Sequence, residues 1–138
     1  MIPRILQFHH LGLAVSEPER ALELLGNLGY ECGAQIQDPL QNVRVVLCSH
    51  LSAPDIEVIS PGETEGPLHS VLKGDHERIY HMCYATRDIG GVLKELELRG
   101  HRVLCVSEPK PAVLFGNQMV SFYIVRGLGL IEILEADR

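Results

Sequence analysis

An internal repeat is the feature of this 138-residue chain that most limits its possible folds. At an offset of 71 residues, His10-Leu-Gly-Leu-Ala14 aligns with His81-Met-Cys-Tyr-Ala85, and the alignment continues without a gap for about twenty residues. At an offset of 75, Asp55-Ile-Glu-Val-Ile59 aligns with Leu130-Ile-Glu-Ile-Leu134, as expected if the second copy has four more loop residues. The chain is therefore predicted to use one supersecondary unit twice.

Each copy begins with a predicted strand followed by a helix. Strands are predicted over 8–15 and 79–86, where short β-prone runs precede helix-start signals. The first helix is predicted to begin at a capping box, Ser16-Glu-Pro-Glu19, to carry an apolar stripe that includes Leu24 and Leu28, and to end at Gly29. In the second copy Asp88 is the predicted cap and Gly100 the predicted end.

Three further strands follow each predicted helix. They cover 30–35, 43–48 and 55–59 in the first copy, and 102–106, 119–125 and 130–134 in the second. We therefore predict an α+β fold with two βαβββ units, 5–60 and 78–136, that form a curved, eight-stranded mixed sheet in a single domain, 1–138. The linker, 61–77, is rich in Gly and Pro and is expected to hold one helical turn near 68–73.

Composition excludes several classes of protein. Apolar residues make up 46% of the chain, which is enough for an ordinary core. The net charge of −6 and the lack of a basic run argue against nucleic-acid binding. The sequence has no apolar run long enough for a membrane span and no signal-like start, so we expect a soluble, cytoplasmic protein without a membrane partner. Its four cysteines show no C-x-x-C spacing and are expected to be reduced, buried and without a dithiol redox motif.

Strand alternation predicts that four polar side chains project from the strand faces that do not pack on a helix. If Leu11, Leu13 and Val15 pack on the helix, the side chain of His10 points the other way, and the same parity argument applies to three further residues, Glu57, His81 and Glu132. Taken singly, a histidine of this kind is more often structural than a metal ligand, and a glutamate is usually solvated. Occupation of repeat-equivalent positions by all four predicts a site for Zn²⁺, Ni²⁺, Co²⁺, Mn²⁺ or Fe²⁺.

These motifs resemble the vicinal oxygen chelate superfamily, which includes glyoxalase I, methylmalonyl-CoA epimerase, extradiol dioxygenases and antibiotic-resistance proteins. The resemblance implies a glyoxalase/bleomycin-resistance/dioxygenase-like fold and metal ligands at His10, Glu57, His81 and Glu132. The local sequence around Ser107-Glu-Pro109 resembles the epimerase branch more closely. In that branch, however, the position of Val45 carries a catalytic glutamate.

The resemblance also implies a reaction class. We expect a metal-dependent isomerase or lyase, similar to methylmalonyl-CoA epimerase or glyoxalase I, that stabilises an enolate or enediolate and uses Glu132 or Glu57 as both ligand and catalytic base. The substrate would carry vicinal oxygens, with thioesters among the candidates. The alternatives are an Fe²⁺ ring-cleaving dioxygenase and a non-catalytic drug-binding protein. Members of this family commonly form homodimers, with the active site within one chain or across two.

Overall fold

A computed structural model describes residues 6–136 of the chain. The chain divides into two compact units. The first unit is His10–Tyr80, and the second combines the chain up to His9 with the chain from His81 onward. Each unit is described by itself below.

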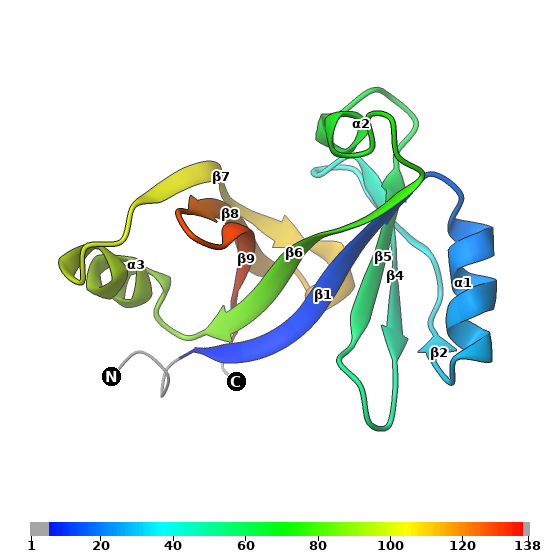
Figure 1. Ribbon diagram of the computed structural model, residues 1–138, viewed down its shortest axis with the longest axis horizontal. Helices are drawn as coiled ribbons and strands as arrows, with labels where there is room; N and C mark the ends of the chain where they lie inside the picture. Colours follow the sequence, from blue (N-terminus) through cyan, green and yellow to red (C-terminus); the bar gives the residue numbers. More distant parts are fainter. Residues whose placement is uncertain (1–5, 137–138) are drawn as a thin grey trace. The chain divides into compact units, whose positions relative to one another are not determined.

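The first unit carries the first copy of the predicted repeat. Its strands are ordered β2-β4-β5-β1, and β3 also pairs with β4. Strands β1 and β5 are parallel, whereas β4 is antiparallel to β5. Figure 1 shows α1 alongside β2, β4 and β5. The elements are β1 (Gln7–Val15), α1 (Pro18–Asn27), β2 (Glu31–Cys32), β3 (Ile36–Asp38), β4 (Val43–Ser49), β5 (Ile56–Pro61) and α2 (Pro67–Val71).

The second unit repeats this arrangement. Its strands are ordered β6-β9-β8-β7, with β6 and β9 parallel and the other neighbours antiparallel. The elements are β6 (Glu77–Thr86), α3 (Ile89–Leu98), β7 (Val103–Ala112), a 3-10 turn (Val113–Phe115), β8 (Gln118–Val125) and β9 (Gly129–Glu135) (Figure 1). The predicted α+β class and the repeated βαβββ pattern are therefore confirmed, with β3 as one further short strand in the first unit.

Each helix covers one face of its own strands. In the first unit, Leu25 of α1 packs against Val15, Val46 and Val58. In the second unit, the α3 residues Ile89 and Val92 pack against an equivalent apolar set that includes Ile131 and Ile133. Strand alternation consequently sends every second side chain to the face without a helix.

The helix ends are partly as predicted. Gly29 and Gly100 have φ values of +98° and +89°, so both adopt the left-handed conformation expected just after a helix. Asp88 caps α3, because its Oδ1 accepts a hydrogen bond from the Gly91 amide at 2.9 Å. The capping box at Ser16 is wrong: Glu17 occupies the cap position without a side-chain bond, and the Ser16 hydroxyl donates instead to the His76 carbonyl at 3.3 Å.

Other element predictions also need correction. The predicted strand 30–35 is only the two-residue strand β2, and β3 is a further short strand that begins beyond the predicted range; both pair with β4. Leu24 and Leu28, assigned to the apolar stripe of α1, are each 59% exposed. Strand β7 continues through Pro109 and Pro111 to Ala112 instead of ending near Val106.

None of the helices in the described part of the chain is long and apolar enough to cross a membrane.

Candidate metal centre

The first unit contains a buried histidine–glutamate pair. Parallel pairing of β1 and β5 aligns Gly12 with Glu57, and His10 lies two residues before Gly12 on the same face of β1. The Nε2 atom of His10 is 3.1 Å from Oε1 of Glu57. His10 is fully buried and Glu57 is 6% exposed. This face is the one that α1 leaves uncovered, because Leu13 and Val58, the residues next in alternation, pack with α1.

The second unit contains the equivalent pair. Parallel pairing of β6 and β9 aligns Cys83 with Glu132, and His81 lies two residues before Cys83. Here too, Nε2 of the histidine is 3.1 Å from Oε1 of the glutamate, and both residues are buried. Ile131 and Ile133 on either side of Glu132 pack toward α3, so Glu132 projects from the opposite face. The same register in both units therefore produces the same pair twice.

The chemistry of these side chains suits a divalent cation. Each of the four residues offers one nitrogen or oxygen donor, and all four are buried. A buried carboxylate is costly unless a positive group or hydrogen-bond donors compensate its charge. Neutral imidazole nitrogen and carboxylate oxygen are ligands that first-row divalent metals accept. The residues present therefore fit a metal ion by donor type and by burial.

Two apolar residues flank the glutamates and were not singled out from the sequence. Phe122 pairs across the strands with Glu132, and its ring stands edge-on to the His81 ring with centroids 5.3 Å apart. Leu47 pairs across the strands with Glu57. The offset of 75 that aligns the two glutamates also aligns these neighbours, so the repeat contained a signal for them. An apolar neighbour reduces the access of water to each carboxylate.

Val45 also lies on the face of β4 that α1 leaves uncovered. It alternates with Val46, which packs under α1, and its side chain is 3% exposed. The side chain cannot accept a proton. Among the described residues of β4, no carboxylate is present to act as a base.

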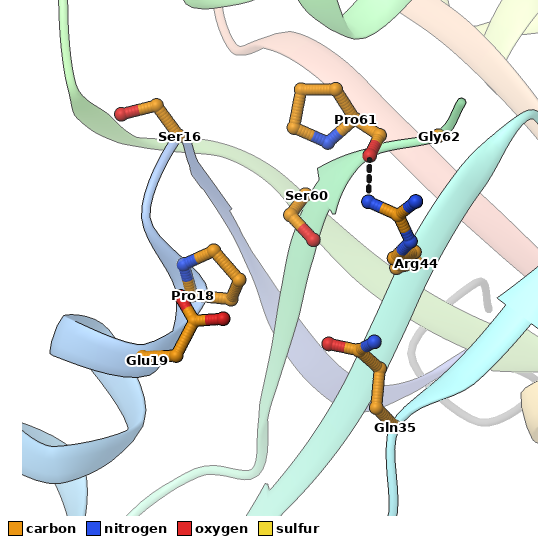
Figure 2. Close-up of a pocket in the computed structure, with 8 residues that line it drawn as sticks. All are labelled: Ser16, Pro18, Glu19, Gln35, Arg44, Ser60, Pro61 and Gly62. Carbon is orange, nitrogen blue, oxygen red and sulfur yellow. Dashed lines mark hydrogen bonds between the residues drawn. The ribbon is translucent and has the colours of Figure 1, made fainter. Parts of the chain in front are cut away.

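A separate pocket of about 440 Å³ lies in the first unit, on the other face of the strands. Arg44 and Ser60, which pair across β4 and β5, share the parity of Val46 and Val58 and so lie on the α1 face. Figure 2 shows the Arg44 guanidinium donating to the Pro61 carbonyl, a bond of 3.2 Å, with Pro18 and Glu19 at the start of α1 nearby. The other lining residues are Ser16, Gln35 and Gly62. His10 and Glu57 are therefore not part of this pocket.

Comparison with known families gives one match that spans most of the chain. Residues 9–122 match the model of the Glyoxalase/Bleomycin resistance protein/Dioxygenase superfamily. No curated protein matches the chain in sequence.

Several solved structures share the fold at low sequence identity. Methylmalonyl-CoA epimerase from Mycobacterium tuberculosis is 19% identical over 96% of this chain and 89% of its own, with a TM-score of 0.76. Hypothetical protein BH1468 from Bacillus halodurans is 23% identical over 96% of both chains, with a TM-score of 0.77. A single-residue variant of Streptomyces coelicolor methylmalonyl-CoA epimerase, in complex with 2-nitronate-propionyl-CoA, is 17% identical over 97% of this chain and 99% of its own, with a TM-score of 0.72.

Proposed function

Because this chain belongs to the glyoxalase/bleomycin resistance protein/dioxygenase superfamily, we propose that it is a divalent-metal-dependent isomerase or lyase. Its substrate would carry two vicinal oxygens next to an acidic C–H bond. The observation that carries this proposal is the duplicated buried pair, His10 with Glu57 and His81 with Glu132. A chain that only sequesters a small molecule has no need of two such pairs.

The proposed ligands are His10, Glu57, His81 and Glu132, acting on one shared cation. When bound, the cation supplies positive charge that stabilises an enolate-type oxygen on the substrate. The histidines supply nitrogen donors from β1 and β6, and the glutamates supply oxygens from β5 and β9. One glutamate would also take the substrate proton as the catalytic base.

Because Val45 has no carboxylate, we restrict the proposed reaction to one that needs a single catalytic base. Inversion at carbon by two bases needs a proton acceptor on each side of the reacting centre. With Glu57 or Glu132 as the base and Val45 unable to accept a proton, we expect proton exchange to be faster than net inversion. This expectation separates the chain functionally from a two-base epimerase, although solved epimerases share its fold.

Metal stoichiometry tests the shared cation. We expect one Co²⁺ or Ni²⁺ per chain by equilibrium dialysis and elemental analysis. H10A and H81A should each weaken binding of that single ion at least tenfold, because loss of one ligand affects the whole site. The exposed His101 provides a matched control, and H101A should bind the metal as the wild-type protein does. Two ions per chain, each lost in only one variant, would show two separate sites and contradict the proposal.

Solvent exchange tests the chemistry. The metal-loaded protein is incubated in D₂O with methylmalonyl-CoA or with the hemithioacetal of methylglyoxal and glutathione, and deuterium incorporation is followed by NMR. Replacement of the glutamate that acts as the base, in E57Q or E132Q, should reduce exchange by about 100-fold or more. Glu135 is an exposed glutamate on the same strand as Glu132, so E135Q should leave exchange unchanged. Oxygen uptake with catechols and Fe²⁺, without any exchange, would instead favour a dioxygenase.

A further inference from the structure

Two cysteines that are sixteen residues apart in sequence face each other in the first unit. Cys32 on β2 and Cys48 on β4 are direct partners across the strands. Their sulfur atoms are 2.7 Å apart, and Cys48 donates its S–H to the sulfur of Cys32. These residues are distinct from the proposed metal ligands, because Cys48 belongs to the apolar cluster under α1, on the opposite face of the strands.

The pairing of β2 with β4 places Cys32 and Cys48 in positions that are compatible with a disulfide bond. The Gly33 amide donates to the Leu47 carbonyl at 2.9 Å, so Gly33 and Leu47 form a hydrogen-bonded pair. Pairs alternate along an antiparallel ladder, and Cys32 and Cys48 are therefore a non-hydrogen-bonded pair. In such pairs the Cα atoms are about 4.5 Å apart, which lies within the range found for disulfides. Formation of a bond would consequently require little backbone movement.

The two thiols differ in their surroundings. Cys32 is half-buried, whereas Cys48 is fully buried. Desolvation, together with the hydrogen bond to Cys32 and the charge of Cys32, raises the pKa of Cys48 to about 12. Cys48 therefore carries almost no thiolate at neutral pH, and the more accessible Cys32 is the sulfur that an oxidant would meet first.

We propose that Cys32 and Cys48 are a redox modification site that closes to a reversible intramolecular disulfide when the protein meets a hydroperoxide. In the first step, the Cys32 sulfur attacks the peroxide oxygen, the O–O bond breaks, and Cys32 becomes a sulfenic acid while the peroxide is reduced to an alcohol or water. In the second step, the Cys48 sulfur attacks the Cys32 sulfur, the S–S bond forms and the S–O bond breaks. The departing hydroxide leaves as water with the proton of the Cys48 thiol. A dithiol reductant reverses the change by thiol–disulfide exchange.

Peptide mapping of the full chain tests this proposal. The reduced protein is treated with hydrogen peroxide, and the remaining thiols are then blocked with an alkylating reagent in denaturant. Trypsin cuts after Arg44, so Cys32 and Cys48 fall in separate peptides, 21–44 and 45–73. We expect these two peptides to appear joined. Before alkylation, the oxidised intact protein should be about 2 Da lighter than the reduced protein, and dithiothreitol should reverse this loss. The exposed Cys105 provides the matched control, and C105S should form the same link.

Single variants separate the two chemical steps. In C48S the sulfenic acid at Cys32 has no resolving partner, so we expect dimedone to label Cys32. In C32S, which alters the more exposed member of the pair, we expect no link and no loss of the Cys48 thiol. Retention of both the Cys32 and the Cys48 thiol by the wild-type protein at peroxide concentrations that oxidise Cys105 would overturn the proposal, as would a link between any other two cysteines. The wild-type mapping remains decisive if C48S does not fold.

Discussion

At the scale of single residues, strand parity proved more informative than local helix signals. The direction of His10 and Glu57 follows from the alternation of their apolar neighbours, and the structure shows them on the face that alternation predicts. Capping is decided by the local backbone path, which spacing alone does not determine. Asp88 and Ser16 both precede helix-like stretches, but only Asp88 lies where its side chain reaches an amide of the first turn.

This difference between the two helix starts predicts different effects of mutation. D88A should lower the free energy of unfolding by about 1 kcal/mol, because the Gly91 amide loses its acceptor. S16A should change it by less than about 0.5 kcal/mol, because Ser16 makes only exposed hydrogen bonds with His76. Urea unfolding followed by circular dichroism would measure both values. An S16A effect as large as that of D88A would mean that Ser16 supports α1 in a way its contacts do not explain.

At the scale of elements, the existence of the strands was predicted better than the residues at which they end. Strand β7 passes through Pro109 and Pro111, two residues that normally signal a loop. It tolerates them because it is last in the strand order of its unit and needs backbone donors on one side only, toward β8. Its register with β8 shifts twice, between Cys105 and Ser107 and between Ser107 and Lys110. Edge position depends on tertiary pairing, so sequence periodicity could not reveal it.

The proximity of Cys32 and Cys48 also depends on tertiary pairing. The separation between Cys32 and Cys48 fits no closely spaced cysteine motif, so the sequence gives no reason to pair them. Their proximity depends on the antiparallel pairing of the two-residue strand β2 with β4. Without that register, Cys32 has no assigned partner. The expectation that the cysteines are buried was wrong for Cys105, which is exposed on β7.

At the scale of the whole molecule, the repeat was the source of what could be predicted. Aligning the chain with itself identified both βαβββ units and placed one histidine and one glutamate in each. The roles of His10, Glu57, His81 and Glu132 in binding a metal stay a prediction. The repeat also aligns Leu47 with Phe122, but their position beside the glutamates was not predicted, because an apolar residue on a strand has an ordinary explanation as part of the core.

Metal binding by the native chain would also raise its stability. A ligand that binds only the folded state adds about 2.7 kcal/mol at roughly 100 times its Kd. We therefore expect Tm to rise with added Co²⁺ or Ni²⁺, and to return to the metal-free value after chelation with EDTA. Differential scanning fluorimetry measures the shift, and the doubly substituted variant E57Q/E132Q should show little of it. The same increase in that variant would assign the ion to other residues.

The residue that pairs with each glutamate across the parallel strands differs between the two units. In the first unit this position is Gly12, which has no side chain, and in the second it is Cys83, which carries a buried thiol. The proposed ligands are thus duplicated, whereas the residues beside them are not. Glu57 and Glu132 occupy equivalent strand positions but have neighbours of different size and chemistry. Duplication of one unit accounts for the two equivalent pairs, and divergence at this single position would let the two carboxylates take different parts in one reaction.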